Sequence, residues 1–260
     1  MKEMLVIVNA DDLGLSEAVN GEVERLHQRG VLSSATIMAT GPAIEGVPAI
    51  QERNPELGLG LHMNATNFRA MTPAIRESKL CDDQGVFHLD FRSRYHRSLT
   101  PLLAQEWMAQ LDKVLDLGIR IDHLDSHHHV HTWPSVLPAL HEVSRRAGIR
   151  WVRNTRNVVP AREKAGWSQR VKYAGKWGWT RCVRMMGMST TEGFCSVTDA
   201  EDLSRSESFP WGLATVELMC HPGDSGNPEY VAECAWLESD FEDWMKGRGR
   251  LVRFTDLELR

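Results

Sequence analysis

Residues 4–16 have the sequence MLVIVNADDLGLS, and this stretch decides how the rest of the chain is interpreted. Residues 4–9 form an apolar run rich in valine and isoleucine, which is typical of a strand buried in a parallel sheet. The polar residues that follow end the strand, and Ser16 can cap a helix over residues 17–29 that stops at Gly30. The opening of the chain therefore predicts a strand, a loop and a helix in that order.

The same order of elements recurs along the chain. Alternating strands and helices imply a parallel sheet with outer helices, which is an α/β fold built either as a (β/α) barrel or as an open wound sheet. We expect one domain over residues 1–260, with insertions at about 66–99 and 155–208, where no regular apolar period is visible. Further strands are predicted at 35–38, 58–62, 121–125, 151–154, 215–220 and 251–254, and further helices at 43–53, 101–117, 135–147 and 230–245.

Composition and charge argue against several classes of protein. With 42% apolar and 25% charged residues, the chain is typical of a globular domain rather than of a disordered or fibrous protein. The formal net charge of −5 gives no overall attraction for nucleic acid, so we expect none as a partner. The five cysteines form no Cys-x-x-Cys pair, which argues against a disulfide framework or a thiolate zinc site and favours a reducing compartment. No targeting segment or membrane span is expected, so the predicted location is cytoplasmic.

Four polar clusters each directly follow a predicted strand. Parallel barrels and wound sheets bind ligands at the carboxyl ends of their strands, so these clusters are expected to converge. Carboxylates and imidazoles together favour a divalent metal such as zinc, magnesium or manganese, which polarises a carbonyl and lowers the pKa of bound water. In an Asp-Asp pair, one carboxylate can ligate the metal while the other faces the water. The clusters are Asn9-Ala10-Asp11-Asp12, His62, Asp125-Ser126-His127-His128-His129-Val130-His131 and His221-Pro222-Gly223.

Each cluster also has a simpler interpretation. The Asp-Asp-Leu-Gly sequence at 11–14, taken alone, is equally compatible with a turn and a helix-capping carboxylate. A single histidine such as His62 is more often structural, and residues 127–131 could bind metal adventitiously as other histidine-rich tracts do. Because three such coincidences at strand ends are difficult to explain by packing, we favour a metal site.

At these residues the sequence resembles the YdjC-type carbohydrate deacetylase family, and the resemblance spans nearly the whole chain. Residues 8–16, VNADDLGLS, are similar to the family signature NADDFGLS, with Leu13 in place of the usual phenylalanine. Residues 123–131, HLDSHHHVH, are similar to the histidine block of the family. The two motifs together are highly specific, so the family is the leading hypothesis.

The resemblance implies a deformed (β/α) barrel that removes the acetyl group from an N-acetylated sugar, either an oligosaccharide or a glycolipid. It implies one divalent metal ion, magnesium or zinc, held by Asp12, His62 and His127. Asp11 would then be the general base that activates the attacking water, and His221 would be the acid that protonates the leaving amine. Relatives in the family also suggest a homodimer.

Three further residues are expected close to the metal ligands. Asp125 could orient a ligand imidazole, while His129 and His131 are predicted to support the ligands or to contact substrate. The chain departs from the family after the third strand, where Met-Asn-Ala-Thr follows His62 in place of a Leu-Thr-rich segment. The predicted ligand is kept, but the neighbouring substrate contacts can differ.

Residues 160–188 are the only concentrated basic stretch, and they also contain three tryptophans. The simpler interpretation, which we favour, is a solvated helix that packs its tryptophans on the barrel. The alternative is a substrate platform that stacks sugar rings on tryptophan and binds an acidic or lipid-phosphate-linked glycan near a membrane surface. The residues concerned are Arg162, Lys164, Arg170, Lys172, Lys176, Arg181, Arg184, Trp167, Trp177 and Trp179.

Two other functions stay open on the sequence alone. A metal-dependent phosphoesterase could use the same site, although that chemistry often uses two metals and the clusters lack a second carboxylate-rich set. A barrel that only binds a glycan or a metal is the third possibility, but a binding module does not need an Asp-Asp pair beside the metal. The leading hypothesis is therefore a metal-dependent carbohydrate N-deacetylase, which is an amide hydrolase.

Overall fold

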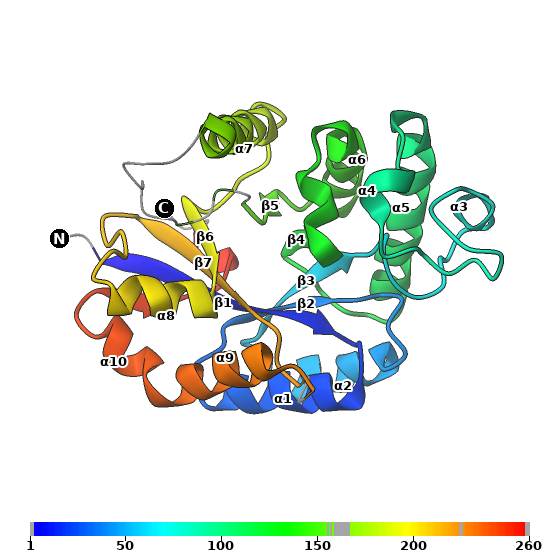
Figure 1. The fold of residues 1–260 in the computed structure, drawn as a ribbon. Helices are drawn as coiled ribbons and strands as arrows, with labels where there is room; N and C mark the ends of the chain where they lie inside the picture. Colours follow the sequence, from blue (N-terminus) through cyan, green and yellow to red (C-terminus); the bar gives the residue numbers. More distant parts are fainter. Residues whose placement is uncertain (1–2, 155, 157, 159–166, 224–225, 258–260) are drawn as a thin grey trace.

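The computed structural model describes residues 3–154, 156, 158, 167–223 and 226–257. In this part of the chain an eight-stranded parallel sheet forms the centre of the molecule (Figure 1). The strands are β1 (Met4–Leu13), β2 (Ser34–Ile37), β3 (Gly58–Met63), β4 (His123–Ser126), β5 (Trp151–Val152), β6 (Gly193–Ser196), β7 (Thr215–Cys220) and β8 (Gly249–Leu251).

The sheet curves into a half-barrel. Its strands lie in the order β5-β4-β3-β2-β1-β7-β6, β8 pairs with the start of β1, and every ladder is parallel. On the side where β5 and β6 end the sheet, the Phe194 amide donates to the Arg156 carbonyl (3.1 Å), and the Val158 amide donates to the Phe194 carbonyl (2.7 Å). The chain leaving β5 thus runs along β6, and the predicted deformed (β/α) barrel is confirmed.

Helices surround the half-barrel (Figure 1). α1, α2 and α9 lie along one side of the sheet, α5 and α6 lie together near β3 and β4, and α7 lies near β5 and β6. No helix among the described residues is long and apolar enough to span a membrane, and the five cysteines are free thiols. The helices are α1 (Glu17–Gln28), α2 (Val47–Arg53), α3 (Pro73–Arg76), α4 (Phe91–Arg94), α5 (Thr100–Asp116), α6 (Leu137–Ala147), α7 (Trp167–Met185), α8 (Val197–Arg205), α9 (Pro228–Ser239) and α10 (Phe241–Met245).

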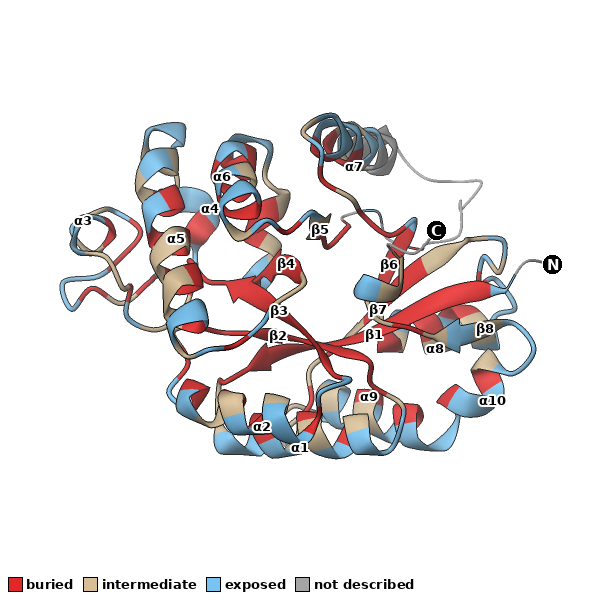
Figure 2. Cartoon of the chain, turned by 180° about the vertical axis from the view of Figure 1, so that it is seen from behind, coloured by how far each residue is buried: buried red, intermediate tan, exposed pale blue. Residues whose placement is uncertain are grey.

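β1 shows why the opening sequence forms the central strand. All ten of its residues are buried, with β2 on one side and β7 on the other, and Figure 2 shows the strand buried along its length. The Ser16 hydroxyl accepts a hydrogen bond from the Val19 amide (3.2 Å), so α1 begins where the sequence predicts. Asp11 and Asp12 lie in the last part of β1, between Ala10 and Leu13, where the register with β2 shifts.

The C-terminal third differs in detail from the prediction. Residues 193–205 contain β6 and α8, which were not predicted because a strand of four residues is too short to show an apolar period. The single helix predicted at 230–245 is two helices, α9 and α10, and the last strand is β8 instead of residues 251–254. The break between the helices lets the rings of Trp236, Phe241 and Trp244 pack at centroid distances of 5.7–5.9 Å.

The predicted insertion at 66–99 is fixed to α5. Glu106 is fully buried in that helix, and its carboxylate accepts a hydrogen bond from the Met71 amide (2.8 Å). One helical turn further on, Gln110 accepts a hydrogen bond from the amide of Asn64, just beyond β3 (2.8 Å). α5 therefore holds both the insertion and the end of the strand that carries His62.

Candidate active site

Three predicted ligands converge at the carboxyl ends of β1, β3 and β4. Asp12 lies near the end of β1, His62 lies in β3, and His127 directly follows β4. Asp12 Oδ1 lies 3.2 Å from His62 Nε2 and 3.0 Å from His127 Nδ1. One ligand atom from each of the three residues lies within 4.8 Å of the other two. The structure thus brings together the ligand set that the sequence predicts.

The chemistry of this group fits a divalent metal ion. One carboxylate and two imidazoles leave positions open for water and substrate, as in catalytic zinc sites. Asp12 Oδ1 is buried and has no hydrogen bond of good geometry from any described residue, although the two imidazole nitrogens face it. Asp12 also has a positive φ of 68°, which is unusual for a residue with a side chain and common at functional sites. A buried carboxylate oxygen without a donor is costly unless a cation is present to neutralise it.

The buried carboxylates around Asp12 and His62 favour a positive charge at this place. Burial opposes ionisation of Asp12, but His127 and His62 outweigh it and hold the pKa of Asp12 well below its usual range. Burial also disfavours a charged His62, yet the carboxylates of Asp125 and Asp11 raise the pKa of His62 well above its usual value. The positive charge favoured here is one that a metal ion supplies as well as a proton does.

Asp125 orients the candidate ligand His62. Its Oδ1 lies 2.6 Å from His62 Nδ1, and the Thr36 hydroxyl donates to its Oδ2 (3.1 Å). With Nδ1 engaged in this way, Nε2 of His62 faces Asp12. A carboxylate behind a ligand histidine fixes the tautomer and the direction of the ring. Asp125 therefore lies where its predicted orienting role requires it.

Arg153, just beyond β5, is the important residue that the sequence analysis missed. Its side chain is fully buried, and Nη1 and Nη2 donate to both oxygens of Asp11 (2.7 and 2.6 Å). Nη1 also lies 2.8 Å from Asp125 Oδ2, and Nε donates to Glu217 Oε1 (2.7 Å). Burial disfavours the guanidinium charge, but Asp11, Asp125 and Glu217 raise the pKa of Arg153 well above its usual value. A signal for this pair was present in the sequence. Arg153 lies in the predicted strand 151–154 and Glu217 lies in the predicted strand 215–220, and a charged residue that is buried in a strand needs a partner.

Asp11 lies between Arg153 and two histidines. Its Oδ2 is 4.0 Å from His62 Nε2 and 4.0 Å from His221 Nε2. The two-pronged contact with Arg153 fixes the plane of the carboxylate. Asp11 also belongs to a second group of possible metal ligands, with His62 and Asp125. Because Arg153 already occupies both oxygens of Asp11, the group that contains Asp12 is the better metal site.

His221 directly follows β7, and α9 holds its ring. Tyr230 stacks on the imidazole with a centroid distance of 4.3 Å. Glu233 Oε2 accepts a hydrogen bond from the His221 amide (2.9 Å) and lies 3.5 Å from His221 Nδ1. Burial disfavours the charged ring, but Glu233 and Asp11 outweigh it and raise the pKa of His221. His221 is therefore held with Nε2 toward Asp11, by a buried glutamate that the sequence analysis did not predict.

The histidine block after β4 forms a strained turn. His128 and His129 have φ angles of 52° and 54°, a left-handed conformation that consecutive residues with side chains rarely adopt. The turn directs His127 toward Asp12, while His128 Nδ1 lies 2.9 Å from Thr66 Oγ1 in the insertion. Adjacent histidines thus face different partners, and the strain is located at the candidate ligand.

The last two histidines of the block lie deeper. His131 is fully buried, and its Nδ1 lies 2.6 Å from Ser126 Oγ, so its position fits a supporting role. His129 is partly buried, with its ring 5.6 Å from that of Phe194. Loss of hydration, reinforced by the charge of Arg153, lowers the pKa of His129 to about 4. His129 is therefore neutral near pH 7.

In the basic segment 160–188, one tryptophan fits the interpretation of a helix packed on the barrel and another does not. Trp179 is buried and packs on His131 with a centroid distance of 5.9 Å, as the simpler interpretation predicts. Trp177 is 58% exposed and does not fit that interpretation. Arg162 and Lys164 lie outside the described residues, as do the side chains of Trp167, Arg170 and Lys172.

Comparison with known proteins identifies the family. The model of the YdjC-like protein family matches residues 5–246. The chain belongs to this family. A carbohydrate deacetylase of Halalkalibacterium halodurans is 30% identical over 96% of this YdjC-like chain and 94% of its own length. A carbohydrate deacetylase of Vibrio cholerae is 40% identical over 146 residues, or 55% of this chain, and the chain spans about half the length of that relative (56%).

A solved structure shares the YdjC-like fold. A candidate cellobiose-phosphate cleavage protein of Enterococcus faecalis superposes with a TM-score of 0.79, covering 98% of this chain and 99% of the other. Its sequence identity is 21%, so the likeness shows the fold alone. The half-barrel is therefore an architecture that this family shares with a protein of low sequence identity.

Proposed function

We propose that the protein is a metal-dependent hydrolase that removes the acetyl group from an N-acetylated sugar. The observation that carries the proposal is the convergence of Asp12, His62 and His127, with Asp11 on one side of them oriented by Arg153. The names of the relatives, which are carbohydrate deacetylases, support the substrate class.

Asp12, His62 and His127 would hold one divalent ion, magnesium or zinc, which would polarise the acetyl carbonyl and acidify the attacking water. The protein contributes the direction of the ligands. Asp125 holds the ring of His62, and the left-handed turn after β4 aims His127. These supports act before substrate binds, so the site is preorganised for the reaction.

Asp11 accepts the proton of the water that attacks the acetamide carbonyl. Its carboxylate is held in one plane by Arg153, so the base does not need to reorient during the reaction. The pairing with Arg153 also leaves the carboxylate with a fixed direction toward His62 and His221.

His221 donates a proton to the leaving nitrogen. Nε2 faces Asp11, while Glu233 lies on the Nδ1 side and favours the imidazolium. As the carbon–nitrogen bond breaks, the nitrogen takes this proton, and the acetic acid formed passes its own proton to the free amine, so that acetate and an ammonium group are released. One water is consumed, and the proton held by Asp11 can return to His221, so both groups regain their starting states.

Acetate release from a panel of N-acetylated oligosaccharides and glycolipids tests the proposal. Metal-stripped protein is reconstituted with zinc, magnesium or manganese and compared with His62→Ala and with His96→Ala, an exposed histidine away from the site. We expect metal-dependent release that His62→Ala abolishes and His96→Ala retains. Failure of every member to release acetate, with metal bound, would overturn the proposal, and release of phosphate would favour a phosphoesterase instead.

The predicted cytoplasmic homodimer and the glycolipid alternative belong to the same proposal. Sedimentation velocity of the purified chain measures the oligomeric state, with a dimer expected. Rates on a free oligosaccharide and on the same head group carried in vesicles distinguish the two forms of substrate.

A further inference from the structure

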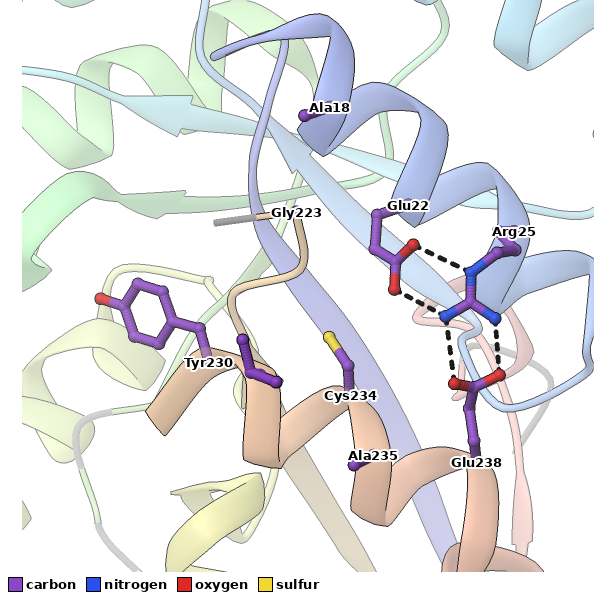
Figure 3. A pocket seen from close by; sticks show the side chains of 9 residues that line it. Ala18, Glu22, Arg25, Gly223, Tyr230, Cys234, Ala235 and Glu238 are labelled. Carbon is purple, nitrogen blue, oxygen red and sulfur yellow. Dashed lines mark hydrogen bonds and ion pairs between the residues drawn. The ribbon is translucent and has the colours of Figure 1, made fainter. Parts of the chain in front are cut away.

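Two surface cavities of similar size both contain arginine, but they differ in whether carboxylates pair with it. The first, of about 460 Å³, lies between α1 and α9 (Figure 3). Arg25 projects into it and is bound by both Glu22 and Glu238, with the shortest contact to each at 2.6 Å. The positive charge in this cavity is therefore matched by carboxylates of the protein itself.

The second cavity, of about 380 Å³, lies on α7 and has no acidic residue among the described residues that line it. No ion pair joins its three arginines to a carboxylate in the described part of the chain. Three guanidinium groups around one hollow give it a positive potential that favours an anion. We call this hollow the α7 cavity; its lining residues are Arg156, Trp177, Thr180, Arg181, Arg184 and Met185.

One face of α7 supplies most of the α7 cavity. Trp177, Arg181 and Arg184 are spaced four and three residues apart, which puts them on the same side of a helix. The guanidinium of Arg181 lies 5.8 Å from the centre of the Trp177 ring, and the residue Trp177 is 58% exposed. An exposed indole beside guanidinium groups offers a flat apolar surface for a sugar ring and charged donors for an anionic substituent.

The α7 cavity is tied to the segment that orients Asp11. The Thr180 hydroxyl, in the cavity wall, donates to Asn154 Oδ1 (3.1 Å), and Asn154 directly follows Arg153. Arg156 is three residues beyond Arg153, so their Cα atoms are at most about 11 Å apart. The wall of the α7 cavity is therefore close along the chain to the residue that orients Asp11.

From these contacts we propose that the α7 cavity binds an anionic group, phosphate or carboxylate, carried by the sugar substrate at a distance from its acetamide. The inference rests on the proposed deacetylase function for its link to catalysis. Arg181 and Arg184 hold the anion, and Trp177 packs against the adjoining sugar ring. The cavity thus selects charged oligosaccharides over neutral ones of the same length.

Kinetics on matched substrates test this assignment. Three N-acetylated oligosaccharides of equal length are compared, one neutral, one with a terminal phosphate and one with a terminal uronic acid. The double variant Arg181→Gln, Arg184→Gln is compared with Arg145→Gln, an exposed arginine on α6. Loss of charge-assisted hydrogen bonds is expected to raise KM for at least one charged substrate about tenfold or more, with kcat and the neutral substrate little changed.

Direct binding separates this inference from the deacetylase proposal. Calorimetry with the same phosphate- or uronate-bearing oligosaccharides lacking acetyl groups measures occupancy of the α7 cavity without turnover. Binding that weakens with salt and is lost in the double variant supports the cavity even if no acetate is released from any substrate. Equal affinity of wild type and double variant for both charged ligands overturns it, as does a wild type that binds neither.

Discussion

On the β1–β3–β4 side of the candidate site, Asp12, His62 and His127 lie at strand ends with their donor atoms facing a common point. On the β5–β7 side, by contrast, the charges are already paired: Arg153 engages three carboxylates, and Glu233 lies beside His221. The first side is a set of candidate ligands whose donor atoms fit a cation. The second is a preassembled network that orients Asp11 and His221, the proposed base and acid. The comparison leads to the expectation that metal binding depends on the β1–β3–β4 side and that proton transfer depends on the β5–β7 side.

Asp11→Asn is expected to cause the largest loss of activity, because Asp11 contacts both sides: it binds Arg153 and lies 4.0 Å from His62. The amide cannot accept a proton, so kcat should fall about 10²–10⁴-fold while the bound metal is retained. Turnover and metal content of the same preparation measure both effects. Asp83→Asn, at an exposed position in the insertion, is the control. Wild-type turnover of Asp11→Asn would remove the base from the mechanism.

Arg153→Met is expected to cause the largest loss of stability. Removing one partner of a buried ionic network leaves charged groups uncompensated, which typically costs about 3–5 kcal/mol. In a chain of this length that corresponds to a fall in Tm on the order of 10 °C by calorimetry. Arg120→Met replaces an exposed arginine and should change Tm little. A small change of Tm in Arg153→Met would mean that the fold does not need the guanidinium to compensate the charges of the three carboxylates.

Asp125→Asn is expected to weaken metal binding about 10–100-fold, because the neutral amide no longer fixes the ring of His62 as strongly. Asp122→Asn is a matched control. Asp122 Oδ1 lies 2.5 Å from Nδ1 of His123, a histidine that is not one of the candidate metal ligands. Metal affinity by titration compares the two variants. Similar losses in both would show that the effect is one of general stability and not of ligand orientation.

Glu233→Gln is expected to change the pH dependence more than the maximal rate. Glu233 raises the pKa of His221, so its charge keeps the acid protonated to higher pH. Without that charge the pKa of His221 falls, and the alkaline limb of the profile of kcat/KM should move to lower pH. Glu229→Gln, at an exposed position in the same helix, should leave the profile unchanged. An unmoved alkaline limb in Glu233→Gln would argue that His221 is not the acid.

The sequence was informative where residues close together in the chain form the feature. The run before Asp11 predicts β1 and Ser16 predicts the start of α1, because each depends on a local pattern. The strand ends predict that polar clusters converge, and the resemblance to the family implies which residues form the donor set. Arg153 was not predicted as a site residue, since nothing near it in sequence reveals Asp11 as its partner 142 residues away. The same applies to Glu233, which reaches His221 from the second turn of α9.

Metal titration is the most direct test of the central claim, that Asp12, His62 and His127 together hold one divalent ion. Calorimetry on metal-stripped protein compares wild type, His127→Ala and His128→Ala, two adjacent histidines with different partners. We predict one equivalent of metal for wild type and for His128→Ala, and affinity weakened about 100-fold or more in His127→Ala. Full affinity in His127→Ala would contradict the claim.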